Sequence, residues 1–376
     1  MTTNNRNSIT SSYKIKKLNR KIRGTRRKRP TRNTVRSKII AAIPVAELSR
    51  TETPEPNDTL FAGLWRCDTT EGVDAWQKAS FDKFNVKALK ALRPRVSVSN
   101  RAIITALLSQ TGAASIPLLT SEAICRESSK MLLAMLTAMV AADPEMEIAF
   151  VTIISGDGGT SHFKTDIELH ESLKRVQRTL RAMSPDFFGV TELALFNSQG
   201  HPDGGQMLQV HTHSLVVGHG VVAKAQDIAA KHAAHFTPNF SGAPVISVKK
   251  VATTEINLAR ISAYLFKAPY KCMNWNPGKD GKRGHMNGSE KGDRYVRYLR
   301  LAQLRTLLRY EDMSFGGGAG AKIRSDMIKF VRALAAKDST AGRRVLHPDA
   351  IASFWIALAP EIKADRWNLP IIKTRR

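Results

Sequence analysis

Two strand-like segments separated by a short connection constrain the fold of this chain most. Residues 187–196 and 207–217 are apolar, rich in β-branched and aromatic side chains, and bounded by Gly, Pro or Asp. The connection, residues 197–206, is too short for the helix that a parallel crossover requires. The pair therefore predicts an antiparallel hairpin.

The neighbouring segments extend this hairpin into a larger fold. Strand patterns occupy 147–154, which the Gly-rich run 155–159 should close, and 245–251. Helical patterns occupy 168–183, 223–236 and 254–268. The order β-α-β-β-α-β-α predicts an α+β domain with a central antiparallel sheet and helices packed on one face. The other face should stay open to a ligand.

The whole chain divides by composition into four parts. Residues 1–38 are expected to be a disordered basic arm, and 39–142 a mostly helical lead-in segment. Residues 143–275 should form the domain that contains this sheet, and 276–376 a Gly-rich loop followed by a basic helical C-terminal region. Within the lead-in, one helix is predicted to begin at Thr120-Ser121 and to end at Asp143-Pro144.

The charge indicates a polyanionic partner. The 376 residues include 58 Lys and Arg against 32 Asp and Glu, a net charge of +26. Fourteen of these cations lie in residues 1–38, which contain no acidic residue. Nucleic acid is the commonest partner for such a chain. The arm itself could bind phosphate backbones, aid solubility or act as a targeting signal, and charge alone does not separate these roles.

Cysteine usage and hydropathy indicate a soluble cytoplasmic protein with no membrane partner. The three cysteines are far apart and form no CxxC pair, so neither a zinc finger nor a disulfide framework is predicted. The longest apolar stretch, residues 131–142, is shorter than the ~20 residues that span a bilayer. No apolar core of the signal-peptide kind follows the N-terminal charges.

A pair of histidines on the second hairpin strand suggests a metal site. His211 and His213 are two residues apart, so they share one strand face with Gln209. A turn near residue 202 would bring Glu192, the one ionisable group of 189–196, opposite them. Two His and a carboxylate leave coordination positions open and admit Mn²⁺ or Mg²⁺, with Zn²⁺ also possible. Alternatively, all three are ordinary polar strand residues.

The helix at 254–268 supplies candidate catalytic groups. Arg260, Tyr264 and Lys267 cluster on one side of it, opposite an apolar stripe. A phenol has a pKa near 10, so nearby cations would favour its attack on a phosphate and stabilise the transition state. Tyr270 is a second candidate, beyond Pro269. An amphipathic surface helix without catalytic function would show the same pattern.

Three motifs in this order resemble those of a known superfamily. Phe150-Val-Thr-Ile-Ile154 resembles the first motif, Val210-His-Thr-His-Ser214 the metal motif, and Ala263-Tyr-Leu-Phe-Lys267 the nucleophile motif of HUH single-strand nucleases. Within that superfamily the chain most resembles the replication initiator (Rep) proteins of rolling-circle plasmids and phages. The likeness covers about residues 145–272.

The resemblance implies a fold and a reaction. It implies an RRM-like antiparallel sheet, a divalent metal bound by His211 and His213, and nicking of one DNA strand by Tyr264, assisted by Lys267. The products would be a 5′-phosphotyrosine and a free 3′-hydroxyl that primes synthesis. Thr212 departs from the hydrophobic residue usual between the histidines. The lack of a partner tyrosine near Tyr264 favours single-tyrosine chemistry.

The partners expected on this reading are single-stranded origin DNA, a host polymerase and, because no helicase motif is present, a host helicase. A relaxase or an HUH transposase would share the chemistry. A non-catalytic single-stranded nucleic-acid-binding protein and a hydrolytic zinc enzyme are rivals of other classes. Stacking platforms usually present aromatic side chains, whereas this strand presents Gln and His.

Several other segments have weaker signals. Residues 315–322 are Gly-rich, but Ile323 occupies the Ser/Thr position of a phosphate-binding loop and no Gly precedes Lys322. His201 lies in the hairpin loop and is a further candidate near the metal. The Gly-rich run 278–292 could clamp single-stranded DNA or be a surface loop without a function. The arginines after residue 290, among them Arg297, Arg300 and Arg305, are candidates to bind the origin duplex or an oligomer partner.

Overall fold

The computed structural model describes thirteen segments of the chain: residues 49–51, 63–90, 96–109, 112–113, 116–117, 121–161, 169–197, 206–238, 244–268, 272–276, 285–289, 295–340 and 348–358. All of them belong to one compact unit, Pro44–Arg376. The predicted basic arm, residues 1–38, lies outside the described residues, as does most of the Gly-rich run 278–292.

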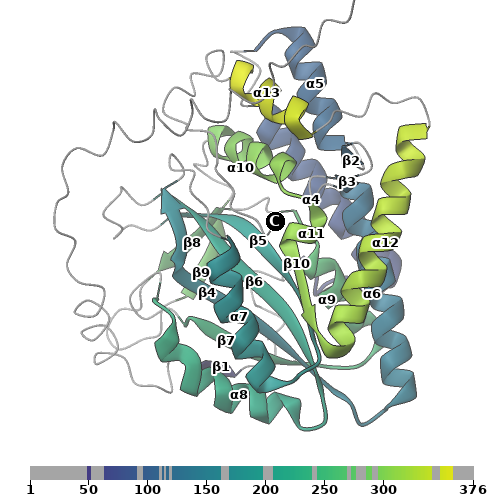
Figure 1. Ribbon diagram of the computed structural model, residues 1–376, viewed down its shortest axis with the longest axis vertical. Helices are drawn as coiled ribbons and strands as arrows, with labels where there is room; N and C mark the ends of the chain where they lie inside the picture. The colour runs from purple at the N-terminus through teal and green to yellow at the C-terminus, as the bar shows by residue number, and fades with distance from the viewer. Residues whose placement is uncertain are drawn as a thin grey trace, which may run out of the picture. The chain divides into compact units, whose positions relative to one another are not determined.

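Eight of the described strands form one large sheet, ordered β1-β7-β4-β6-β5-β8-β9, with β10 also paired to β5 (Figure 1). Five of them, β7, β4, β6, β5 and β10, make an antiparallel core, while β1 and β8 join in parallel. Their bounds are β1 Ser49–Thr51, β4 Glu147–Ser161, β5 Phe187–Asn197, β6 Gln206–Gly218, β7 Ile246–Val251, β8 Cys272–Asn276, β9 His285–Ser289 and β10 Ser314–Gly317. The α+β class with a central antiparallel sheet is therefore confirmed.

The predicted hairpin is the centre of this sheet. β5 and β6 pair antiparallel along their whole lengths, with Glu192 directly opposite His211. On its other side β6 pairs with β4, so that Thr152 lies opposite His213. Cross-strand partners point to the same face, and these four side chains therefore share one face.

One strand boundary differs from the prediction. β4 continues to Ser161, although the Gly-rich run after Ile154 predicts that it ends there. The pairing with β6 shifts register between Ile154 and Gly159. The extra residues are accommodated as a bulge, for which glycine is well suited.

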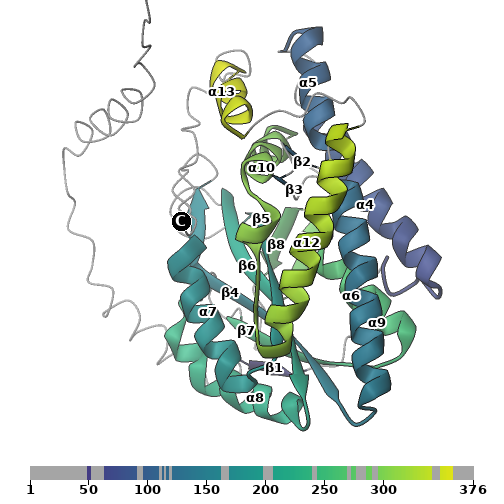
Figure 2. The same cartoon turned by 45° about the vertical axis from the view of Figure 1, so that its right-hand side comes forward.

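Helices cover both faces of the sheet, and not one face as expected (Figures 1 and 2). α7 (Leu169–Met183) and α8 (Val221–His232) lie against one face, and α9 (Glu255–Leu265) lies against the other. The apolar run of β4 explains this, because Ala149 and Val151 face one layer while Phe150 faces Tyr264 of α9. A strand buried on both faces needs a continuous apolar run, whereas a half-exposed strand alternates.

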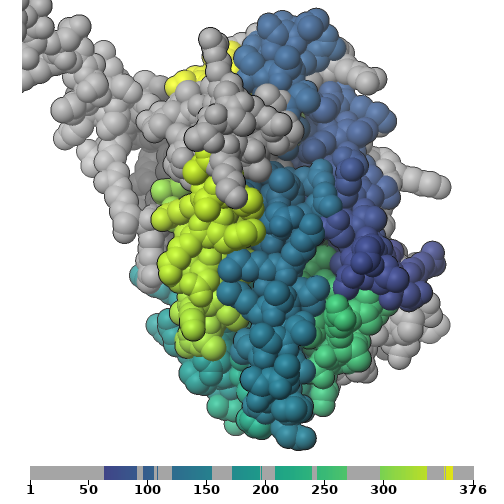
Figure 3. All heavy atoms as spheres, turned by 90° about the vertical axis from the view of Figure 1, so that its right-hand side faces the viewer, coloured from purple at the N-terminus to yellow at the C-terminus, as the bar shows by residue number. Residues whose placement is uncertain are grey.

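Two long helices pack over α9. α4 (Thr70–Lys90) and α6 (Glu122–Ala142) contact it and each other, so the helical lead-in is part of the main core. α6 begins and ends as predicted: the Ser121 side chain accepts a hydrogen bond from the Ile124 amide, and the helix ends at Asp143. Figure 3 shows α6 on the surface between α4 and α12 (Gly318–Thr340).

The C-terminal region completes the helical layer. Its helices are α10 (Tyr295–Leu307), α11 (Tyr310–Met313), α12 and α13 (Pro348–Leu358), and α5 (Val98–Ser109) lies near α10. A small two-stranded sheet, β2 (Gly112–Ala113) with β3 (Ile116–Pro117), contacts α12. None of the described helices is both long and apolar enough to cross a membrane.

The Gly-rich run after Phe315 forms the tight corner between β10 and α12. The Ala319 amide donates a hydrogen bond to the Asp186 carboxylate, and Gly318 has a left-handed φ of 50°. A Cβ at Gly320 would overlap the Phe187 carbonyl, and one at Gly316 would overlap Gly320. These glycines therefore allow close packing of the corner against β5.

Candidate metal centre

Three side chains converge on the face of the hairpin that α9 covers. The Nε2 atoms of His211 and His213 lie 3.1 Å and 3.0 Å from Oε2 of Glu192. One donor atom from each of the three residues lies within 4.8 Å of the others, and both histidines are buried. The predicted meeting of Glu192 with the His pair is confirmed.

The His213 ring is held in one orientation. Its Nδ1 lies 3.0 Å from the Thr152 hydroxyl on β4, within hydrogen-bonding distance. Its ring stacks on Phe150 at a centroid distance of 5.5 Å and an interplanar angle of 16°. A hydrogen bond at one ring nitrogen leaves the other, Nε2, for a ligand, which is the usual arrangement around metal-binding histidines.

Lys267 makes an ion pair with Glu192 just beyond the end of α9. Burial alone would raise the pKa of the Glu192 carboxyl, but Lys267 and the two histidines together hold it well below its ordinary value. Burial and then the Lys267 charge lower the pKa of His213 to about 3. The carboxylate is therefore ionised and the His213 imidazole neutral at pH 7, the forms that bind a metal.

The group Glu192, His211 and His213 could thus hold a metal ion. Two imidazole nitrogens and one carboxylate oxygen suit Mn²⁺, Zn²⁺ and related ions, while Mg²⁺ prefers oxygen ligands. Three protein ligands would leave further coordination positions open.

Tyr264 and Lys267 both reach this group. The Tyr264 ring lies edge-on to the His213 ring at a centroid distance of 5.0 Å. The Lys267 ammonium lies 3.8 Å from the centre of the Tyr264 ring. Tyr264 is 3 % exposed, because α9 is enclosed between the sheet and the helices packed over it. The last turn of α9 is therefore the part of this helix that belongs to the site.

Arg260 is not brought to the site. Its Nε and Nη2 donate hydrogen bonds to the Cys67 carbonyl at 3.1 Å and 2.8 Å, and its guanidinium lies over the Trp65 ring. Arg260 lies about one turn, or ~6 Å along the helix axis, before Tyr264. That turn faces the segment preceding α4, so Arg260 joins α9 to that segment. Tyr270 and His201 lie outside the described residues.

The end of α9 is held by a residue that the sequence did not single out. Gln77 of α4 donates from Nε2 to the Phe266 carbonyl at 3.2 Å and to the Ser129 hydroxyl of α6 at 2.9 Å. It is buried between the two helices. A lone Gln in a helical pattern gives no sequence signal for such a role.

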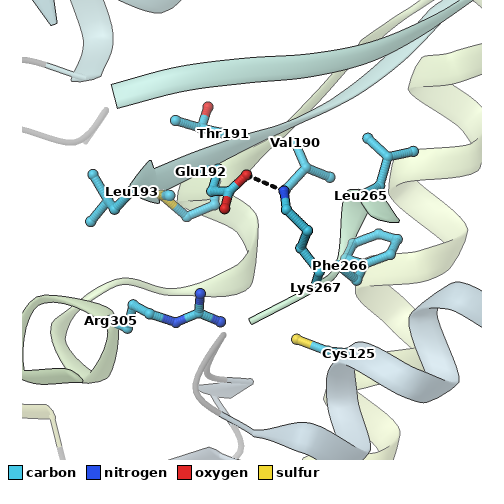
Figure 4. Close-up of a pocket in the computed structure, with 10 residues that line it drawn as sticks. Cys125, Val190, Thr191, Glu192, Leu193, Leu265, Phe266, Lys267 and Arg305 are labelled. Atoms are coloured by element: carbon cyan, nitrogen blue, oxygen red, sulfur yellow. Dashed lines mark hydrogen bonds and ion pairs between the residues drawn. The ribbon is translucent and has the colours of Figure 1, made fainter. Parts of the chain in front are cut away.

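Arg305 of α10 lies in a place that the sequence did not predict. Together with Glu192 and Lys267 it lines a small cavity beside the histidines, and Cys125 of α6 lines the far side (Figure 4). The sequence suggested that the arginines after residue 290 bind the origin duplex or an oligomer partner, which would require them to be exposed. Arg297, Arg300 and Arg305 are instead buried, because α10 packs against α4 and β5.

Comparisons with known proteins identify no relative: the chain matches no protein-family model, no curated protein and no solved structure.

Proposed function

We propose that the protein is a metal-dependent DNA endonuclease that cuts one strand by forming a covalent bond to Tyr264. The main support is the geometry of the sheet face: a His–His–Glu group whose donor atoms lie within 4.8 Å, with the Tyr264 ring 5.0 Å from that of His213. The resemblance of the three motifs to those of HUH Rep proteins is the basis for proposing attack by a tyrosine and a 5′-phosphotyrosine product. The net charge of +26 suits a DNA substrate.

In this reaction the Tyr264 oxygen forms a bond to the phosphorus of a DNA phosphodiester. The bond between that phosphorus and the 3′-oxygen breaks, the phenol loses its proton and the 3′-oxygen gains one. The products are a 5′-phosphotyrosine and a 3′-hydroxyl, and reversal of the same steps rejoins the strand. Lys267 stabilises the negative charge on the phosphate as it is attacked.

Glu192, His211 and His213 would hold a divalent ion, which when bound polarises the scissile phosphate. Mn²⁺ is the better fit to two nitrogen ligands and Mg²⁺ the alternative. Thr152 holds the His213 ring at Nδ1, which would leave Nε2 to bind the ion. Because Tyr264 is 3 % exposed, the end of α9 must open when DNA binds.

The biological role that we propose is initiation of rolling-circle replication in the cytoplasm. A host polymerase would extend the 3′-hydroxyl, and a host helicase would unwind the duplex. A relaxase or HUH transposase would use the same residues, and the position of the nicked sequence, at an origin or at transposon ends, would distinguish them.

The proposal is tested with Mn²⁺ and labelled single-stranded DNA from the neighbourhood of the gene. Wild type should give a denaturant-resistant protein–DNA adduct that EDTA prevents, and Tyr264→Phe should give none. Tyr310→Phe, which also removes the hydroxyl of a buried tyrosine, is the matched control and should behave as wild type. An adduct that persists in Tyr264→Phe would assign the nucleophile to another residue.

The burial of Tyr264 favours a second candidate, metal-dependent hydrolysis in which water attacks the phosphate. In that case Tyr264→Phe would still cleave DNA, and wild type would form no covalent adduct. A non-catalytic single-strand binder would bind the DNA without cutting it, with or without metal.

A further inference from the structure

Two neighbouring helices, α7 and α8, cover the sheet face opposite the candidate metal centre (Figures 1 and 2). Two side-chain contacts join them. The Thr179 hydroxyl of α7 lies 3.1 Å from Nδ1 of His232, the last residue of α8. The Arg175 guanidinium of α7 lies over the Phe236 ring, just beyond the end of α8. The two helices are thus held together, with their outer sides turned away from the sheet.

The outer side of α7 is basic. From residue 172 to residue 183 the helix contains four cations and no carboxylate. Lys174, Arg178 and Arg181 are exposed, and their spacing places them on one side of the helix, in a row about 10 Å long. Leu180, on the inner side, is buried. The row therefore forms the solvent face of α7.

α8 adds further positive charge beside this row. Its charged side chains, all exposed, are those of Lys224, Lys231 and one acidic residue, Asp227. The Lys231 ammonium lies 2.6 Å from the Asp227 carboxylate, so that pair is neutral. Lys224 makes no ion pair with the described residues, and its charge adds to that of α7.

The cations of two other helices are placed differently. On α12, Lys329 pairs with Asp326 and Arg332 with Glu311 of α11, so their charges are balanced locally. The arginines of α10 are buried and cannot meet a large partner. The outer face of α7 and α8 is therefore the better candidate for contact with a polyanion.

This face suits a partner that is recognised by its phosphate backbone. Duplex DNA carries about one negative charge per 1.7 Å of its length, so a row of about 10 Å faces several phosphates. Single-strand binders usually place aromatic side chains against the bases, and neither α7 nor α8 contains Phe, Tyr or Trp. Lys and Arg side chains alone hold a duplex by its phosphates and read no sequence.

We propose that the outer face of α7 and α8 is a second DNA-binding surface, which holds duplex DNA through its phosphates. Arg178 and Arg181 of α7 and Lys224 of α8 contact the phosphates. That this duplex flanks the strand cut at the metal centre rests on the proposed function, whereas the binding of a duplex does not. Because α7 and the metal centre lie on opposite faces of the sheet, the duplex and the cut strand are held at separate places.

The test is the binding of a labelled blunt-ended DNA duplex to the full chain in EDTA, measured by fluorescence anisotropy over a series of salt concentrations. The double variant Arg178→Gln/Lys224→Gln removes two cations of the surface. The matched control, Arg66→Gln/Lys322→Gln, removes one exposed Arg before α4 and one exposed Lys on α12. Both double variants have the same net charge, so the N-terminal cations contribute equally to their DNA binding.

The logarithm of the affinity falls linearly with the logarithm of the salt concentration, by about 0.9 for each phosphate contact. The slope should therefore become shallower by about 2 in Arg178→Gln/Lys224→Gln and stay at the wild-type value in the control. Both variants should keep the wild-type thermal stability, because all four residues are exposed. Equal slopes in the two variants would overturn the surface. An equally large change of slope with single-stranded DNA would overturn its assignment to a duplex.

Cleavage assays separate this proposal from the proposed function. If wild type forms no adduct with single-stranded DNA, but the duplex slope changes only in Arg178→Gln/Lys224→Gln, the surface stands and the nuclease does not. If that variant binds duplex as wild type does and still forms the adduct, the nuclease stands and the surface is overturned. A shallower duplex slope with an unchanged adduct yield on single-stranded DNA would support both.

Discussion

At the scale of single residues, the two threonines around the histidines show how the face of a strand decides what a side chain does. Thr152 lies opposite His213 and its hydroxyl is 3.0 Å from Nδ1 of that ring. Thr212 lies between the histidines but on the opposite face, where its buried hydroxyl makes no hydrogen bond to the described residues. The same residue type is therefore a partner of the metal centre in one position and a core residue in the other.

This difference gives a direct prediction. Thr152→Val should weaken Mn²⁺ affinity about tenfold, because loss of a hydrogen bond that orients a ligating histidine typically costs 10–100-fold. Thr212→Val is the control of equal shape, and it should leave Mn²⁺ affinity unchanged and stability equal or slightly higher. Isothermal titration of both variants with Mn²⁺ checks this. Equal affinities would mean that Thr152 does not orient a metal ligand.

Some residues of the site could be predicted from the sequence and others could not. Glu192 could be found because a hairpin with a short loop fixes which residues face each other. Arg260 was misplaced because helical spacing says which side a residue lies on but not what covers that side. The positions of Arg305 and Gln77 in the structure could not be predicted, because they depend on the packing of helices distant in sequence.

At the scale of elements, the corner between β10 and α12 shows why a Gly-rich run need not bind phosphate. The helix begins so close to β5 that the Gly320 position has no room for a Cβ beside the Phe187 carbonyl. The sequence departs from the phosphate-binding loop pattern at Ile323. The structural role of these glycines could not be predicted, because it depends on a contact with β5, a strand more than a hundred residues earlier in the chain.

Gly320→Ala should destabilise the protein by about 3 kcal/mol, since backbone atoms must move to relieve the overlap. Gly72→Ala near the start of α4 is the matched control: its Cβ would meet ordinary van der Waals contacts, and alanine is the better helix former. Urea denaturation should therefore show a clearly lower free energy of unfolding for Gly320→Ala and an unchanged or higher one for Gly72→Ala. Equal stabilities would contradict the close packing of this corner against β5.

The contact between α4 and α6 should make stability depend on pH. Arg126 donates hydrogen bonds to Asp74, and these lower the pKa of that carboxyl. A lowered folded-state pKa stabilises the fold fully above the unfolded-state pKa of about 3.9, and this contribution is lost as pH falls through the folded-state value. Asp74→Asn should lower the free energy of unfolding by about 1 kcal/mol at pH 7, since the pair is partly exposed. Near pH 3 the decrease should be smaller.

Denaturation of wild type and Asp74→Asn at both pH values measures this difference. Asp227→Asn removes a carboxylate from a more exposed pair with Lys231 and should cost almost nothing at either pH. If Asp74→Asn lowers the free energy of unfolding by the same amount at both pH values, the ion pair with Arg126 is not the cause of the decrease.

At the scale of the whole molecule, the sheet has helices on both faces, and the candidate site lies on a covered face. The segment order and the α+β class followed from patterns within single segments. The helical layer on the second face could not be predicted in this way. It depends on α4 and α6, and their own sequence patterns do not identify the surface against which they pack. The continuous apolar run of β4 was the one local sign of it. The proposed chemistry consequently requires movement at the end of α9.

The measurement that tests the central claim most directly is identification of the residue joined to DNA. The full chain is incubated with Mn²⁺ and single-stranded DNA, the adduct is digested with nuclease and protease, and the modified peptide is sequenced by mass spectrometry. The account predicts a nucleotide attached through its 5′-phosphate to Tyr264. Cleaved DNA with no modified peptide, or attachment at Tyr270 or another residue, would contradict it.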